Sequence, residues 1–364
     1  MTLTTSRRDI IGGAFGFASA LALAACARRD GGGQDGVARL PLTAPLPDQI
    51  PPGVELSIGD PTVQHALDYA GLAKDLPFKV KWAQITGGPG VTEAFNARAL
   101  DVGLGVSVPA VHAQWSGIPI KIIGVSQRKD PLKHPTYVLG VSPKAQVHSL
   151  ADLRGKKIAF SRSQIQAMVV LESLKAAGLS TRDVTLVDLP SSIGGDVYTN
   201  ALASNAVDVA PIGAGIIAQR YLANFGRDGA RVIAHPPFRD DIITIYVRTE
   251  TLEDPAKAAA LKAFLPYWAR AEAWMQTHRA EWAQKYYVEN QGLTPRDAGI
   301  ILDAASETDI PKSWDDAIAL VQTTIDLLGP ETGRPHFDAA SLFDRRFEPL
   351  GGDAFAGALQ EQKT

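Results

Sequence analysis

Cysteine is almost absent from this chain of 364 residues, in which Cys26 is the only one. A single cysteine excludes an internal disulfide and any metal site built from several cysteines. The seven histidines are scattered without the spacing of metal ligands, and no Ser/His/Asp order or pair of catalytic carboxylates stands out. The glycine loop at residues 86–90 lacks Gly-Lys-Ser/Thr, so nucleotide hydrolysis has no support. We therefore expect no catalytic residue, no metal and no cofactor.

An excess of basic residues is also missing. Lysine and arginine together number 36, against 39 acidic residues, for a formal net charge of −3. A nucleic-acid binder would show a basic patch or a high isoelectric point, so this class of function is excluded. No long apolar run follows residue 25, so we expect no further segment that crosses a membrane.

The first 26 residues have the pattern of a targeting segment that is not part of the fold. Ser6-Arg7-Arg8 resembles the start of a twin-arginine export signal. The apolar run that follows, residues 10–25, is too short and too rich in glycine and alanine for a good membrane span. It ends in Leu-Ala-Ala-Cys26, which resembles a lipoprotein cleavage box. We expect an exported protein that is anchored to a membrane by a lipid on Cys26; a catalytic Cys26 is the alternative.

Residues 27–53 have the composition of a flexible tether. A run of three glycines at 31–33 is followed by prolines at 41, 45, 47, 51 and 52, which favours a flexible and then semi-extended chain. At the other end of the chain, we expect residues 348–364 to form a tail.

Strands and helices are predicted to alternate through the middle of the chain. Apolar runs at 54–59, 78–82, 101–105 and 120–125 predict four strands with helical segments between them, and the pattern repeats at 158–160, 184–189, 206–211 and 231–234. This order predicts a doubly wound, mostly parallel α/β sheet in each half. Extended segments at 137–141 and 242–247 would cross between the halves. We therefore expect one lobe from residues 54–140 and 242–347, with C-terminal helices, and a second lobe from residues 141–241.

Ligands of such sheets bind outside the carboxyl ends of the strands. The loops at those ends in the first lobe are rich in small, hydroxyl and amide residues, which can donate hydrogen bonds to an anion. The candidate ligand-binding residues there are Asp60, Gln64, Thr86, Gly87, Gly88, Ser107, Gln127 and Arg128.

The segment Ser149–Leu179 gives the strongest local signal. A short apolar strand at 158–160 leads through the loop Ser161-Arg162-Ser163-Gln164 into a helix that begins near Ile165. A helix N-terminus favours negative charge, and Arg162 adds a fork of donors, so we interpret this loop as an anion site. The simpler interpretation is a capping serine beside a solvated arginine. Ile212 and Gly213, after a later strand, complete the candidate site.

Three segments carry a resemblance to a known family. SLADLRGKKIAFSRS, GGPGVTEAFNARALDVGLG and ALASNAVDVAPIG resemble solute-binding proteins of ABC importers, in the group that binds alkanesulfonates, taurine, nitrate or pyrimidine precursors. The resemblance implies a type II periplasmic binding protein fold whose cleft closes by a hinge over a small organic anion, such as a sulfonate or taurine. It also implies delivery of that ligand to an ABC permease and its ATPase, and we expect a monomer.

Two other functions stay open from the sequence. One is an enzyme on the same fold, either a C–S lyase of the desulfinase kind or a pyrimidine-forming protein; the other is a sensor that hands its ligand to a membrane receptor. Two positions depart from the family pattern: Arg162 stands where relatives often have a small residue, and the Ile212-Gly213 loop lacks an aromatic residue seen in many of them.

Overall fold

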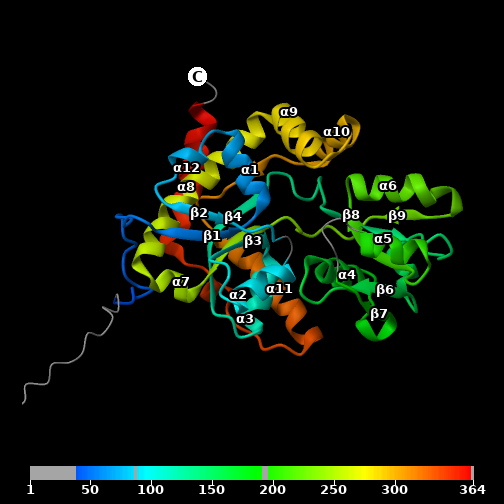
Figure 1. The fold of residues 1–364 in the computed structure, drawn as a ribbon. Coiled ribbons are helices and arrows are strands. Elements are labelled where there is room, and N and C mark those ends of the chain that lie inside the picture. The colour runs from blue at the N-terminus through cyan, green and yellow to red at the C-terminus, as the bar shows by residue number, and fades with distance from the viewer. Residues whose placement is uncertain (1–37, 86–87, 191–195, 362–364) are drawn as a thin grey trace, which may run out of the picture. The chain divides into compact units, whose positions relative to one another are not determined.

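The computed structural model describes residues 38–85, 88–190 and 196–361. Residues 39–364 cluster as one compact unit, which contains two sheets with helices packed on them (Figure 1). The predicted signal segment and Cys26 lie outside the described residues.

The first sheet has six strands in the order β11-β4-β10-β3-β1-β2. Strands β1 to β4 share one direction, and β10 runs against its neighbours β3 and β4. Together with the helices that pack on it, this sheet forms the first lobe. Its strands are β1 Glu55–Gly59, β2 Lys79–Trp82, β3 Val102–Val106, β4 Ile120–Arg128, β10 Ile243–Arg248 and β11 Thr308–Asp309.

The second sheet has five strands in the order β7-β6-β8-β5-β9. Strands β6 to β9 share one direction, and β5 runs against β8 and β9. This sheet and its helices form the second lobe. Its strands are β5 Tyr137–Val141, β6 Lys157–Phe160, β7 Thr185–Asp188, β8 Val209–Gly213 and β9 Arg231–Ile233. The predicted two-lobed α/β architecture is confirmed, and both sheets are mixed because β10 and β5 run antiparallel to their neighbours.

Helices follow most strands, as the alternating pattern predicted. In the first lobe they are α1 Pro61–Tyr69, α2 Gly88–Asn96 and α3 Ser107–Trp115, and in the second lobe α4 Ile165–Ala176, α5 Asp196–Ala203 and α6 Ile216–Phe225. The C-terminal region adds α7 Thr249–Glu253, α8 Pro255–Thr277, α9 Arg279–Trp282, the π-helix η5 Ala283–Asn290, α10 Pro295–Ala304, α11 Asp315–Thr332 and α12 Glu348–Glu361. Short 3-10 turns occupy Ala73–Asp75, Leu150–Leu153, Thr181–Asp183, Gly226–Asp228, Ala339–Leu342 and Arg345–Phe347.

Two chain crossings connect the lobes, and helix α11 packs against both. The second crossing is hydrogen-bonded to the first through two buried carboxylates. Asp240 accepts hydrogen bonds from the N–H groups of Thr136 (2.8 Å) and Tyr137 (3.1 Å). Asp241 accepts one from the N–H of Arg128 (2.8 Å). Helix α11 contacts both α3 and α4. Its residue Ile325 belongs to the core of the first lobe, and Leu328 belongs to a core of the second.

Three boundaries differ from the sequence-based expectation. The segment expected to be a tether up to residue 53 packs on the first lobe from residue 39 onward, with Leu46 buried and Leu42 and Ile50 against the same core, because its apolar side chains are better covered than exposed. Residues 348–361, expected as part of a tail, form α12, which packs along α8. Strand β5 lies wholly in the second sheet, so the first crossing precedes Tyr137.

No helix within the described ranges is both long enough and apolar enough to traverse a lipid bilayer.

Candidate ligand-binding site

A cavity of about 620 Å³ lies between the two lobes, where the carboxyl ends of the parallel strands lead into helices. This volume is within the usual range for small-molecule sites. The residues at these junctions that line the cavity are Gly59 and Asp60 before α1, Gly88 at the start of α2, Val106 before α3, Gln164 before α4 and Gly213 at the end of β8. The cavity therefore lies where the sheet topology predicts a ligand.

Helix α1 begins at Pro61, directly after Asp60, which follows the end of β1. Asp60 is its N-cap, and one carboxylate oxygen, Oδ1, accepts hydrogen bonds from the N–H groups of Thr62 (2.7 Å) and Val63 (3.0 Å). Pro61 at the first helical position has the fixed φ that a helix start needs. This start brings both Asp60 and Thr62 to the wall of the cavity.

The wall of the cavity is polar, but its formal charge is confined to one carboxylate. Among the described lining residues, Asp60 is the only one with a charged side chain, and there is no lysine, arginine or histidine. Burial raises the pKa of Asp60, although hydrogen bonds from the first turn of α1 partly oppose that effect. The neutral polar residues that line the cavity are Thr62, Thr136, Tyr137, Gln164, Gln166, Tyr198, Tyr286, Tyr287 and Gln291.

Five of the predicted binding residues line this cavity: Asp60, Gly88, Gln164, Ile212 and Gly213. Thr86 and Gly87 lie outside the described residues. The remaining predicted residues do not line it. Gln64 accepts a hydrogen bond from the Nε2 of Gln84 (3.3 Å) at an exposed position.

The loop before α4 is arranged differently from the predicted anion site. Arg162, whose side chain is 63% exposed, forms an ion pair with Asp188 (3.1 Å) at the end of β7. The buried hydroxyl of Ser161 donates a hydrogen bond to the Oε1 of Gln164 (2.6 Å), and Ser163 is half-buried outside the cavity wall. This loop therefore presents Gln164 and the start of α4 to the cavity, and it does not present a cation.

Gln127 belongs to the connection between the lobes. Its Nε2 donates to Asp309 (2.8 Å), and its Oε1 accepts from Arg239 (3.0 Å). Arg128 donates to the backbone oxygen of His134 and lines a second cavity of about 300 Å³. That second cavity shares Thr136, Gly213, Ile217 and Tyr287 with the first, so the two adjoin.

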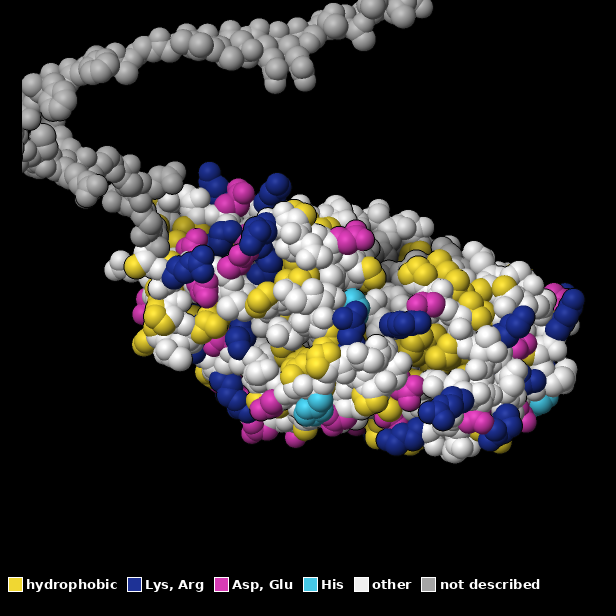
Figure 2. Space-filling view, turned by 90° about the horizontal axis from the view of Figure 1, so that it is seen from below, with side chains coloured by type: hydrophobic (Ala, Val, Ile, Leu, Met, Phe, Trp, Pro, Cys, Tyr) yellow, Lys and Arg dark blue, Asp and Glu magenta, His cyan; other side chains and the backbone are white. Residues whose placement is uncertain are grey.

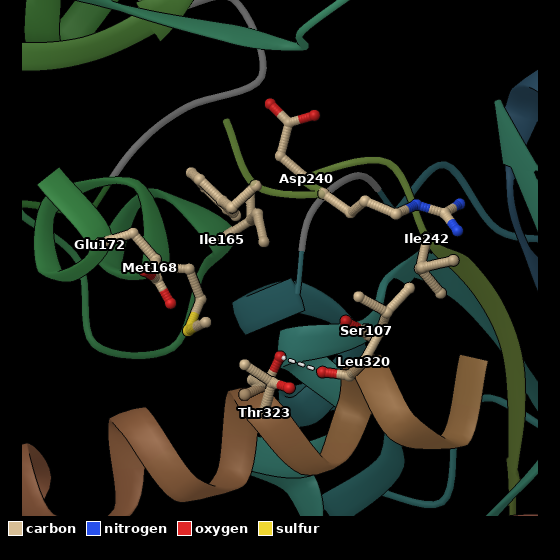
Figure 3. A pocket seen from close by; sticks show the side chains of 11 residues that line it. Ser107, Ile165, Met168, Glu172, Asp240, Ile242, Leu320 and Thr323 are labelled. Carbon is tan, nitrogen blue, oxygen red and sulfur yellow. Dashed lines mark hydrogen bonds between the residues drawn. The ribbon is translucent and has the colours of Figure 1, made fainter. Parts of the chain in front are cut away.

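Ser107 lies beside a small cavity of about 50 Å³ at the second crossing. Figure 3 shows its hydroxyl among side chains of α4 and α11, with Ile165 and Met168 on one side and Leu320 on the other. The volume is sufficient for water but far below that of an organic ligand site.

Sequence reasoning missed most of the aromatic lining. Tyr286 and Tyr287 come from η5, and the hydroxyl of Tyr286 lies 3.1 Å from that of Thr62 on α1. Tyr137 and Tyr198 line the second-lobe side. The adjacent tyrosines in a helical segment were the one available signal, but nothing local indicates that this segment folds back over α1.

Within the described part of the chain, no three histidine, cysteine, aspartate or glutamate side chains are grouped closely enough to hold a metal ion.

Comparison with known proteins agrees with this architecture. An aliphatic sulfonates-binding protein of Escherichia coli is 30% identical over 106 residues, which are 29% of this chain and 32% of that protein. One of Bacillus subtilis is 26% identical over 209 residues, 57% of this chain and 59% of that protein. These alignments thus cover from about a third to less than two thirds of the relatives' own length.

Among solved structures, the alkanesulfonate-binding protein of Xanthomonas axonopodis pv. citri, bound to MOPS, superposes with a TM-score of 0.66 at 22% identity. The match covers 82% of this chain and 99% of that one, and it confirms the two-lobed binding-protein fold. The family model described as NMT1/THI5 like matches residues 75–278, which are more than half of the chain. The chain therefore belongs to the NMT1/THI5-like family.

Proposed function

We propose that this protein is the solute-binding component of an ABC importer and that it captures a small organic sulfonate in the cavity between its lobes. The observation that carries the proposal is the cavity itself, which has the volume of a ligand site and is lined by strand-to-helix junctions of both lobes. The names of the two bacterial relatives, both aliphatic sulfonates-binding proteins, support the choice of ligand.

The first turn of α4 is the proposed place of the sulfonate group. Gln164, Ile165 and Gln166 at this helix start line the cavity. Backbone N–H groups at a helix start point outward along the axis, and the helix dipole favours negative charge there. A sulfonate spreads one charge over three oxygens, so neutral donors of this kind can hold it without an arginine.

The organic part of the ligand would contact the apolar wall. Leu104 and Pro109 contribute this wall from the first lobe, and Ile212 and Ile217 contribute it from the second. A ligand that contacts both lobes stabilises the closed arrangement relative to an open one, which is the usual basis of hinge closure. In this proposal the lobe around the six-stranded sheet closes on the lobe formed by β5 to β9 and their helices.

The proposed location is outside the cytoplasm, on a membrane surface. The twin arginines, the short apolar run and the Leu-Ala-Ala-Cys26 box occur in the order that export followed by lipidation requires. A lipid on Cys26 would hold the folded unit, which begins at Arg39, beside a permease and its ATPase.

Basic and acidic side chains are interspersed on the face seen in Figure 2, which is not the pattern of a nucleic-acid surface.

A thermal-shift screen of the purified protein tests the proposal. The panel contains taurine, alkyl and aryl sulfonates, nitrate, bicarbonate and pyrimidines. A ligand that binds only the folded form adds about 2.7 kcal/mol of stability at one hundred times its dissociation constant. We expect a shift with at least one sulfonate that is recovered unchanged from the mixture. A shift only with a heterocycle would contradict the sulfonate, and conversion of a sulfonate or sulfinate would indicate the enzyme instead.

A further inference from the structure

We infer that the ligand of the cavity carries an ammonium group as well as its anionic group, and that Asp60 and Tyr286 bind this ammonium on the first-lobe side. The inference rests on the proposed function and narrows it from organic sulfonates to zwitterionic ones. It follows from the distribution of charge and of tyrosine side chains around the cavity.

Asp60 has only neutral hydrogen-bond partners. The N–H groups of Thr62 and Val63 bind one carboxylate oxygen, and the hydroxyl of Thr62 also interacts with the carboxyl group. None of the ion pairs within the described residues includes Asp60, and no neighbouring cation lowers its pKa. A largely desolvated carboxylate on a cavity wall without a counter-ion attracts a positively charged ligand group.

A second carboxyl group, that of Glu272, also favours binding of a cation near Asp60. Glu272 lies on α8, which packs against α1. Burial, together with the charge of Asp60, raises the pKa of Glu272 to about 7. Because the charge of Asp60 opposes ionisation of Glu272, a cation bound at Asp60 would offset that repulsion.

Tyrosine side chains complete the subsite. The hydroxyl of Tyr286 lies 3.1 Å from that of Thr62, two residues after Asp60. Tyr287 lines the same wall of the cavity. The Tyr286 ring stacks on Trp282, so its hydroxyl oxygen, which can accept a hydrogen bond from an ammonium group, is the part that would contact the ligand. The anionic group would lie across the cavity at the start of α4, so the two charges of one ligand would contact different lobes.

The test compares three probes. Taurine and propane-1-sulfonate have nearly the same shape, but taurine has an ammonium where propane-1-sulfonate has a methyl group; propylammonium has the ammonium alone. Asp60→Asn removes the charge and keeps an N-cap, because asparagine caps helices as well as aspartate does. Asp254→Asn is the matched control, since Asp254 caps α8 before Pro255 with the same two N–H contacts and lies outside the cavity.

Titration calorimetry should show that wild-type protein binds taurine more tightly than propane-1-sulfonate by about 10- to 100-fold, the effect of one charged hydrogen-bonding partner. Asp60→Asn should abolish this preference, and Asp254→Asn should retain it. Equal or tighter binding of propane-1-sulfonate by wild type would overturn the ammonium site and leave the sulfonate function standing. Binding of propylammonium alone, dependent on Asp60, would overturn the sulfonate and keep the ammonium site. Binding of none of the three overturns both.

Discussion

Arg220 of α6 and Asp297 of α10 form an ion pair of 2.8 Å that joins the second lobe to the C-terminal helices of the first. Helix α10 approaches α6 on one side of the two sheets (Figure 1), and both helices line the cavity that adjoins the main one. The hydrogen bond from Arg220 lowers the pKa of Asp297. The pair therefore favours the arrangement in which the lobes are close together.

Loss of this pair should weaken ligand binding slightly. Arg220→Gln is expected to raise the dissociation constant for a bound sulfonate by up to about 5-fold, because an exposed ion pair contributes at most roughly 1 kcal/mol. Lys312→Gln, which breaks an exposed pair with Asp353 in the C-terminal region, is the control and should leave affinity unchanged. Calorimetry at low and high salt measures both, and the difference should shrink at high salt. Equal effects of the two variants would contradict a closing role for Arg220.

Arg162 should be dispensable for binding, despite its position in the loop before α4. Its side chain pairs with Asp188 and lies outside the cavity wall. Arg162→Ala is therefore expected to change sulfonate affinity less than twofold. A loss of tenfold or more would show that Arg162 reaches the ligand in the bound state, as the sequence first indicated.

The stability of the ligand-free protein should depend on Glu272 between about pH 4.5 and pH 7. The pKa of Glu272 is raised from 4.5 to about 7 in the folded state. The folded protein thus retains a proton that the unfolded chain releases, so the free energy of unfolding falls as pH rises through this window, by roughly 3 kcal/mol. Glu272→Gln should remove this slope, whereas replacement of the exposed Glu93 by glutamine should not. Urea denaturation at several pH values measures it, and identical slopes in all three proteins would refute the assignment.

Asp101 should matter for stability but not for binding. Its carboxylate accepts hydrogen bonds from the backbone N–H (2.9 Å) and hydroxyl (3.0 Å) of Ser57, and from Lys257 (2.6 Å), at a buried position. Asp101→Ala leaves these partners without an acceptor and should cost about 2–4 kcal/mol. Sulfonate affinity should be unchanged, because Asp101 precedes β3 at the end remote from the cavity. Unaltered urea unfolding would contradict this structural role.

The sequence was sufficient for the alternation of strands and helices because strands that are covered on both faces leave continuous apolar runs. Residues 158–160 and 242–247 illustrate this: both segments form strands within one or two residues of the expected limits. The start of α1 at Pro61 has a local signal, because aspartate followed by proline is the signature of a capped helix start.

The composition of the site depends on contacts that no local pattern reveals. Arg162 forms an ion pair with Asp188 because β6 and β7 are neighbours in the sheet, with Phe160 opposite Asp188. Neither segment alone indicates that the two strands pair. Tyr286 reaches the cavity only because η5 folds back toward α1, more than two hundred residues earlier in the chain. The predicted tether extends too far, to residue 53, because the prolines of this segment indicate an extended chain. The spaced apolar residues Leu42, Leu46 and Ile50, which pack on the first lobe, were the better indication.

The most direct test of the central claim is sulfonate binding in a protein whose cavity has been filled. Gly105 lines the cavity, and a Cβ added there would have no atom within 4 Å, so the side chain of Gly105→Leu would start in open space and extend into the cavity. Gly357 of α12 is equally open but lies outside the cavity, so Gly357→Leu is the control. Calorimetry with taurine and propane-1-sulfonate should show one site in wild type and in Gly357→Leu, and none in Gly105→Leu. Binding that survives in Gly105→Leu, or that is absent from wild type, would contradict the account.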